Sequence, residues 1–255
     1  MGRPLAIRRQ EEILRRVGAE GAAGVGDLAA ALGVSHETVR RDLKALAARG
    51  LLAVVHGGAV RHQPVEAAFA DRIAENAAGK AAIARAAAAL VPDGSVLLID
   101  SGTTTLALAQ ALGGKRGLTV CTTSLAAALH LVRHTTHAVH LLGGEVDRGE
   151  EATAGVDTLA AIGRFRVDLA FIGAGGLTPD GEVTDYGRAA AEQRQHMMRA
   201  AARSWLLLDS TKFGRLTPMR LDTTGANLGL VVDAEPPAAA RRALRKRGIE
   251  ILVAA

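Results

Sequence analysis

The larger part of the chain alternates short apolar runs with alanine-rich segments of helical length, and this alternation restricts its fold more than any other feature. The predicted strands are Ser95–Asp100, Leu118–Thr122, Ala138–Leu142, Val167–Ile172, Trp205–Asp209, Leu228–Val232 and Ile249–Val253. The predicted helices are Ala77–Leu90, Thr104–Leu112, Leu125–Arg133, Thr153–Gly163, Ala189–Arg203 and Pro237–Arg247. Short strands alternating with helices form a mainly parallel sheet covered on both faces. We therefore expect an α/β domain over residues 76–255.

The first 62 residues follow a different pattern. Residues 7–17 and Val25–Leu32 carry apolar side chains at helical spacing. After a turn that contains Gly33, Ser35 is a suitable N-cap for a third helix that runs to about residue 48. Short helices joined by a tight turn and followed by a longer helix predict a helix-turn-helix.

The two runs after the third helix, Leu51–Val55 and Ala59–His62, read as a β-hairpin, which would be the wing of a winged helix-turn-helix. We expect a DNA-binding domain over residues 1–62 and a polar linker over residues 63–75. The charge supports this division, because residues 1–62 contain ten Lys or Arg and six Asp or Glu, whereas the remaining 193 residues contain 21 and 20. A basic surface suits a domain that binds phosphates.

The third helix has the two faces that a recognition helix needs. Val39, Leu43 and Leu46 fall on one side at 100° per residue, whereas Arg41 and Lys44 fall on the other. The alternative is a small three-helix domain with solvated arginines on its surface.

Hydroxyl and glycine residues follow several predicted strands. Asp100-Ser101-Gly102-Thr103-Thr104 ends one strand and opens a helix, where backbone N–H groups and the helix dipole favour an anion. The other candidate residues around this edge of the sheet are Lys80, Thr122, Thr123, Ser124, Gly173 and Lys212. Because ligands of parallel sheets bind at the carboxyl ends of strands, we expect a sugar-phosphate pocket here. The alternative is an ordinary N-cap with spare hydroxyls.

Two motifs resemble the signature of the DeoR family of transcriptional regulators. Val34–Leu43 resembles its V-S-x-x-T-[IV]-R-R-D-L stretch, and His56-Gly57-Gly58-Ala59 resembles its H-G-G-A stretch. The DNA contacts that we predict, in part from this resemblance, are Ser35, His36, Thr38, Arg40, Arg41, Lys44, His56, Gly57 and Gly58. Val54 stands where the family often has Arg, so the wing would hold the DNA backbone less tightly.

The resemblance continues through the second domain, at Asp168–Gly176 and Leu208–Gly214 among other stretches. In that family the sensor domain is similar in fold to ribose-5-phosphate isomerase. The resemblance implies that Lys80 and Ser101–Thr104 hold a phosphate. Glu192 and Arg194 stand where the family usually has a Lys after E-A-x, so the sugar preference would differ.

The competing function is a sugar-phosphate isomerase with an accessory basic domain. The isomerase carries acids in a D-G-A-D-E stretch, but the aligned Ile172–Gly176 has no carboxylate to move a proton. An RNA-binding or structural role is disfavoured because aromatic residues make up only 2%. We therefore predict a repressor of a carbohydrate operon that binds double-stranded DNA and a phosphorylated sugar. We expect a homo-oligomer without catalytic residues or cofactors.

Cysteine and histidine usage adds little chemistry. Cys121 is the only cysteine, so disulfides are excluded and a reducing compartment is favoured. No apolar stretch reaches the roughly 18 residues of a membrane span, so we expect a cytoplasmic protein with no membrane partner. The histidines 130, 134, 137 and 140 suggest a metal, but the last two lie across a turn from the others, and we predict no metal site.

Overall fold

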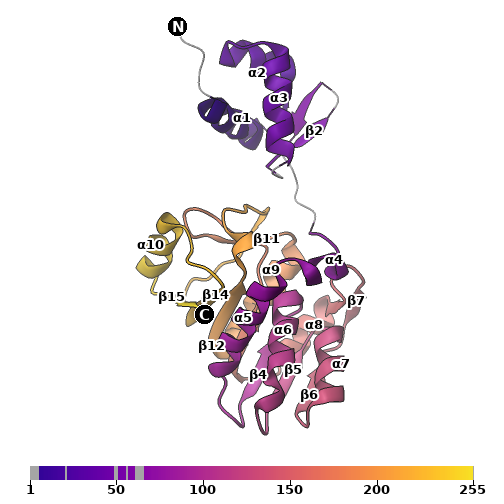
Figure 1. Ribbon diagram of the computed structural model, residues 1–255. Helices are drawn as coiled ribbons and strands as arrows, with labels where there is room; N and C mark the ends of the chain where they lie inside the picture. Colours follow the sequence, from indigo (N-terminus) through magenta and orange to yellow (C-terminus); the bar gives the residue numbers. More distant parts are fainter. Residues whose placement is uncertain (1–5, 21, 49–50, 56, 61–65, 255) are drawn as a thin grey trace. The chain divides into compact units, whose positions relative to one another are not determined.

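The computed structural model describes residues 6–20, 22–48, 51–55, 57–60 and 66–254 (Figure 1). His56, one of the predicted DNA contacts, lies outside the described residues. The chain forms two compact units, residues 1–65 and 66–255.

The N-terminal unit contains three helices and a small antiparallel sheet. The helices are α1 (Ala6–Glu20), α2 (Val25–Leu32) and α3 (His36–Ala48), and the strands are β1 (Ala22–Gly24), β2 (Ala53–Val55) and β3 (Gly58–Val60). The sheet order is β1-β3-β2. Its core contains Ile13, Val17, Leu28, Val39, Leu43, Leu46 and Leu52.

Two features of this unit differ from the sequence prediction. Helix α1 continues through Gly18, because the burial of Ile13 and Val17 outweighs the roughly 1 kcal/mol that a helical glycine costs. Strand β1 was not predicted, since three residues are too few to show an alternating pattern.

The C-terminal unit is built on a seven-stranded sheet in the order β15-β14-β12-β9-β4-β5-β6, with every neighbouring pair parallel. Its strands are β4 (Val96–Ile99), β5 (Thr119–Thr122), β6 (Ala138–Leu141), β9 (Val167–Ile172), β12 (Ala201–Leu208), β14 (Leu228–Val232) and β15 (Glu250–Val253). This confirms the predicted parallel α/β architecture.

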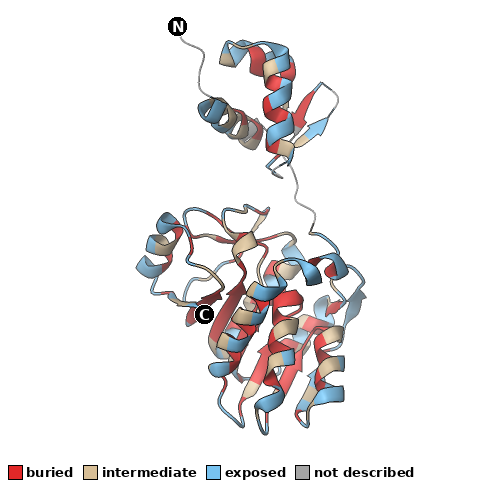
Figure 2. Ribbon diagram, in the orientation of Figure 1, coloured by how far each residue is buried: buried red, intermediate tan, exposed pale blue. Residues whose placement is uncertain are grey.

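Helices cover both faces of the sheet, and successive side chains of each strand point to opposite faces. Leu97 and Ile99 of β4 pack in one core with α5 (Ala77–Ala89), α6 (Thr103–Ala111) and α7 (Leu125–His134). Leu98 packs in the other core, to which α8 (Val156–Ile162), α9 (Arg188–Ala200) and α10 (Ala238–Lys246) contribute. The central strands are therefore buried on both sides (Figure 2).

Several elements of this unit were not predicted. The expected linker contains helix α4 (Phe69–Ala74), whose Phe69 is buried. A hairpin of β7 (Glu145–Asp147) and β8 (Ala152–Ala154) occupies the start of the helix expected from Thr153. Thr153 is held extended there, since its N–H donates to the Thr123 carbonyl at 2.9 Å and its hydroxyl to the Leu142 carbonyl at 2.6 Å.

A second difference concerns the end of α9. This helix ends at Ala200 rather than at Arg203, and β12 begins directly after it because Ala201 and Arg203 pair with β9. A small antiparallel sheet of β10 (Gly176–Leu177), β11 (Val183–Asp185) and β13 (Met219–Arg220) was also not predicted. Strands of two or three residues carry too little periodicity to be recognised.

The order of the strands defines where a ligand can bind. The chain runs from β4 outward through β5 and β6 and then returns to β9 on the other side of β4. The connections that follow β4 and β9 therefore run in opposite directions along the sheet. A crevice opens at the carboxyl ends of these two strands, at the topological switch point.

Candidate functional site

The start of helix α3 is fixed by the predicted N-cap. The Ser35 hydroxyl accepts a hydrogen bond from the Thr38 N–H at 3.2 Å and lies 2.9 Å from the Thr38 hydroxyl. A capping hydroxyl satisfies one of the free N–H groups in the first turn. Both hydroxyls are thus engaged in the cap, while their oxygens remain near the helix surface.

The remainder of α3 has the two faces that its sequence predicts. Val39, Leu43 and Leu46 are fully buried in the core of the unit. Arg41 and Lys44 are exposed, as is Arg40, whose guanidinium lies 3.8 Å from the Glu37 carboxylate. An exposed ion pair at this distance contributes little stability, so the three cations are available to a polyanion. His36 is exposed as well.

An ion pair not found from the sequence holds α3 against α1. Asp42 is buried and accepts from Arg9 Nε at 2.6 Å and from a second guanidinium nitrogen at 3.0 Å. A bidentate pair of this kind fixes orientation as well as contact. Asp42, within the R-R-D-L stretch, therefore positions the recognition helix.

The two described glycines of the hairpin serve its backbone geometry. Gly57 has φ +82°, a conformation that side chains disfavour, and its carbonyl accepts from the Val25 N–H at 2.9 Å. A Cβ on Gly58 would lie 2.4 Å from the Ala23 carbonyl oxygen of β1. These constraints account for both glycines, and their contact with DNA stays a prediction.

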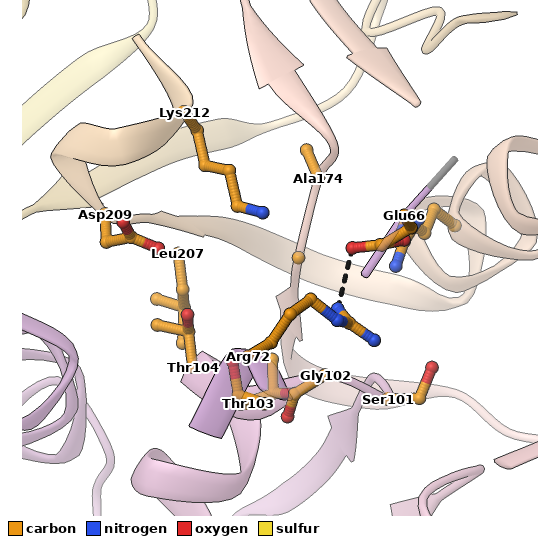
Figure 3. A pocket seen from close by; sticks show the side chains of 13 residues that line it. Glu66, Arg72, Ser101, Gly102, Thr103, Thr104, Ala174, Leu207, Asp209 and Lys212 are labelled. Atoms are coloured by element: carbon orange, nitrogen blue, oxygen red, sulfur yellow. Dashed lines mark hydrogen bonds and ion pairs between the residues drawn. The ribbon is translucent and has the colours of Figure 1, made fainter. Parts of the chain in front are cut away.

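A polar cavity lies at the switch point of the C-terminal unit (Figure 3). Its volume is about 30 Å³. It is lined by Glu66, Arg72, Ser101, Gly102, Thr103, Thr104, Thr105, Gly173, Ala174, Arg194, Leu207, Asp209 and Lys212. Seven of these, namely Ser101 to Thr104, Gly173, Arg194 and Lys212, are residues that the sequence analysis selected.

The loop between β4 and α6 presents free hydroxyls to this cavity. Helix α6 begins at Thr103, so its unpaired N–H groups face the loop. Among the described residues, the side-chain hydroxyls of Ser101, Thr103 and Thr104 have no hydrogen-bond partner, whereas Thr105 donates to the Gly102 carbonyl at 3.0 Å. Gly102 has φ +132°, which requires glycine.

Lys212 brings a buried positive charge to the same cavity. It follows β12 in a short 3₁₀ turn and is only 8% exposed. Its ammonium makes no hydrogen bond or ion pair with any described residue. Burial, assisted by repulsion from Arg215, lowers the pKa of Lys212. A buried ammonium without a partner is costly, so this position favours an anionic ligand.

Arg194, by contrast, is fully engaged by carboxylates. Its Nε donates to Asp100 at 2.7 Å, and a terminal nitrogen donates to Asp185. Burial alone would lower the pKa of Arg194, but the two carboxylates outweigh it and raise the pKa. Asp100 also accepts from the N–H groups of Ser101 at 2.8 Å and Gly173 at 3.0 Å. This network ties the ends of β4 and β9 together and shapes the cavity.

Arg72 of α4 is a cavity residue that sequence reasoning missed. Its terminal nitrogens donate to Glu66 and to Glu150, each at 2.6 Å. Its buried Nε has no partner among the described residues. Burial and the proximity of Glu66 raise the pKa of Glu150 despite this pairing. The one signal in the sequence was Phe69, one of four phenylalanines, three residues before Arg72.

Six predicted effector contacts do not line the cavity, and one of them is Asp100, whose carboxylate is held in the network with Arg194. The Lys80 ammonium is buried and donates to the Arg72 carbonyl oxygen. Thr122 accepts from the Ser124 N–H, Thr123 accepts from Gln193, and Ser124 caps α7. Glu192 is exposed on α9, on the side away from its buried neighbours. Lys80 therefore holds the backbone of Arg72 in place. The polar side chains of Thr122, Thr123 and Ser124 form hydrogen bonds within the protein.

The histidines and the cysteine have ordinary surroundings. His130 and His134 stack with ring centroids 4.6 Å apart, and His137 Nε2 lies 3.2 Å from the Leu112 carbonyl oxygen. Across the described ranges, no three His, Cys, Asp or Glu side chains are grouped to hold a metal ion. Burial raises the pKa of the Cys121 thiol to about 11. No helix in the described part of the chain is long and apolar enough to cross a membrane.

Two domain models match different parts of this chain. The DeoR-like helix-turn-helix domain matches residues 9–65, and the DeoR C terminal sensor domain matches residues 75–234. The chain belongs to the DeoR family of transcriptional regulators. The family confirms the predicted combination of a DNA-binding helix-turn-helix and a sensor domain, and it makes this DeoR-family protein a regulator rather than an isomerase.

Curated relatives span nearly the whole chain. The HTH-type transcriptional regulator GolR of Listeria innocua is 33% identical over 89% of this chain and 89% of its own length. The glycerol-3-phosphate regulon repressor of Escherichia coli K12 is 30% identical over 96% of this chain and 97% of its own length. A solved structure of ribose 5-phosphate isomerase A from Methanocaldococcus jannaschii aligns with 56% of this chain and 57% of that chain at 20% identity and a TM-score of 0.40.

Proposed function

We propose that this DeoR-family regulator represses a carbohydrate operon and that a phosphorylated sugar, bound in the cavity of the sensor unit, changes its affinity for DNA. The observation that carries the proposal is Lys212, a buried and unpaired ammonium that faces a helix N-terminus. Charge-assisted hydrogen bonds from Lys212 and the free hydroxyls would together select a phosphoryl group.

The relatives support a phosphorylated effector. One of them is by its name the repressor of a glycerol-3-phosphate regulon, and another is a putative aga operon transcriptional repressor. The neighbouring carboxylate of Asp209 would suit a hydroxyl group of a sugar, because a carboxylate accepts hydrogen bonds from hydroxyls.

On the DNA side we propose that Arg41 reads a base and that Arg40 and Lys44 contact phosphates. All three cations are exposed on one helix whose opposite face is buried. The protein would act in the cytoplasm as a homo-oligomer, because helix-turn-helix regulators commonly bind two half-sites of a palindromic operator.

The proposal is tested by titrating the full chain with glycerol 3-phosphate, inorganic phosphate and glycerol in a calorimeter. We expect both phosphorylated probes to bind wild type and glycerol not to bind. The Lys212→Met variant should lose about tenfold or more in affinity, since a hydrogen bond to a charged group contributes about 1.5–3 kcal/mol.

The matched control is Lys115→Met, which removes an ammonium that donates to the Val91 carbonyl at 2.6 Å, outside the cavity. That variant should bind the probes as wild type does. If Lys212→Met and Lys115→Met bind both phosphorylated probes equally well, the anion does not bind in this cavity.

A further inference from the structure

The strongest unexplained feature of the sensor unit is the carboxylate that enters its cavity. Glu66 is the first residue of this unit, and its side chain extends into the cavity to an ion pair with Arg72 at 2.6 Å. It has no other hydrogen bond among the described residues. Figure 3 shows this pair beside the loop at Ser101–Thr104, with Lys212 entering from the opposite side.

The free space among the lining groups of the cavity is small. A volume of about 30 Å³ holds roughly two water molecules, and a phosphoryl group alone has five heavy atoms. Movement of a lining group would therefore make room for a ligand. The Asp100–Arg194–Asp185 network is locked by buried hydrogen bonds, and the backbone of Lys212 lies in the 3₁₀ turn that follows β12. Within the described part of the chain, the Glu66 carboxylate is held only by its ion pair with Arg72.

The surroundings of Arg72 allow it to replace Glu66 with another anion. One terminal nitrogen is held by Glu150, whose own backbone N–H is anchored to Asp147 at 3.2 Å. The buried Nε has no partner among the described residues, although buried donors are normally satisfied. A phosphoryl oxygen could satisfy it. The guanidinium fork matches a phosphate as well as it matches a carboxylate.

We propose that the Glu66 carboxylate occupies the position on Arg72 that the phosphoryl group of the effector takes when it binds. Effector binding then displaces the Glu66 carboxylate from Arg72. Arg72 is then an effector-binding residue, completing the site with Lys212 and the Ser101–Thr104 loop. This inference rests on the proposed anion site and adds a competition within it. Because residue 66 directly follows the boundary between the units, the displacement acts on the chain segment that leads to the DNA-binding unit.

The test measures the binding of inorganic phosphate to the full chain by calorimetry, for wild type and for Glu66→Gln. The amide keeps the size of the side chain but removes its charge, so it competes weakly for Arg72. A competitor that occupies a site nine-tenths of the time lowers the apparent affinity about tenfold, and we expect Glu66→Gln to bind phosphate tighter by about that factor. The control Glu182→Gln removes the same charge from an ion pair with Arg220 at 3.5 Å, outside the cavity, and should leave the affinity unchanged.

Hydrogen exchange of residues 66–69 provides a second measurement. In wild type, phosphate should accelerate exchange there, and in Glu66→Gln exchange should be fast already without phosphate. Equal phosphate affinity of wild type and Glu66→Gln, together with a loss of binding in Lys212→Met, would overturn the competition and leave the anion site standing. Absence of phosphate binding in both wild type and Glu66→Gln would overturn the site and the competition together.

Discussion

Among the described residues, most buried charges have an oppositely charged or hydrogen-bonding partner, whereas the ammonium of Lys212 has none. Asp42 pairs with Arg9, and Arg194 pairs with Asp100 and Asp185. Lys212 is also buried, at 8% exposed, and its ammonium has no partner among the described residues. Since an unpaired buried charge opposes folding, we propose that Lys212 serves binding, whereas the paired charges hold the structure.

The buried Asp42–Arg9 pair and the exposed Glu37–Arg40 pair of α3 should differ in how much they stabilise the N-terminal unit. Removing one partner of a buried pair costs about 3–5 kcal/mol, whereas exposed pairs contribute about 0–1 kcal/mol. Asp42→Ala should therefore strongly reduce the free energy of unfolding of the N-terminal unit, and Glu37→Ala should leave it within about 0.5 kcal/mol. Hydrogen exchange of the Val39 and Leu43 amides in the full chain measures both. Similar losses in the two variants would contradict the assigned role of Asp42.

Lys212 predicts a pH dependence of anion binding. Burial lowers the pKa of Lys212 from its usual 10.5 in the free protein, and only the protonated ammonium attracts an anion. The affinity for phosphate should therefore fall as the pH rises from about 8 toward 10.5, a range in which phosphate itself stays dianionic. Calorimetric titrations across this range measure the effect. Lys212→Met should show a flat profile, and a wild-type profile that is equally flat would contradict the assignment.

At the scale of elements, the sequence predicted the strands and helices that are long enough to show a periodic apolar pattern. All seven strands of the parallel sheet and the six helices that cover it were located, because their apolar side chains repeat over four or more residues. The loop after β4, which the sequence analysis selected, lines the cavity, and its contact with an effector stays a prediction. The hairpin β7–β8 and the strands β10 and β13 were missed, since elements of two or three residues are specified by their tertiary contacts.

The same limit explains what was missed in the candidate site. Arg72 lies in a six-residue helix within a segment that composition describes as a linker. Glu66 and Glu150 meet on it from positions 84 residues apart. Lys80 was selected as a candidate at the edge of the sheet and, through the resemblance, as a phosphate contact, but its ammonium is held by the Arg72 backbone carbonyl. Local patterns do not encode such long-range encounters.

The hairpin of the N-terminal unit provides a prediction at the element scale. Gly58→Ala should destabilise this unit, because its Cβ would lie 2.4 Å from the Ala23 carbonyl oxygen. Gly26→Ala, in the exposed first turn of α2, meets no atom within 4 Å and should be neutral or stabilise by up to about 1 kcal/mol. Thermal unfolding of the two variants compares them. If Gly58→Ala unfolds at the temperature of wild type, β3 does not pack against β1 as described.

At the scale of the whole molecule, two units carry separate chemistry. The N-terminal unit carries exposed cations on a recognition helix, and the C-terminal unit carries a polar cavity at a switch point, which we propose binds an anion. Arg41→Ala should reduce specific DNA binding by about 1–3 kcal/mol if Arg41 contacts a guanine. Binding to a non-specific duplex should fall much less, and equal losses on both duplexes would assign Arg41 to a phosphate contact instead.

The central claim is that occupation of the sensor cavity changes the affinity of the recognition helix for DNA. It is tested by fluorescence anisotropy on the full chain, with an operator selected from a random-sequence library and a panel of phosphorylated sugars. One of these sugars should change the operator Kd of wild type by about 5–150-fold. Lys212→Met should bind the operator with wild-type affinity and ignore the sugar. A variant that still responds with wild-type sensitivity, or a wild-type Kd that no phosphorylated sugar changes, would contradict the account.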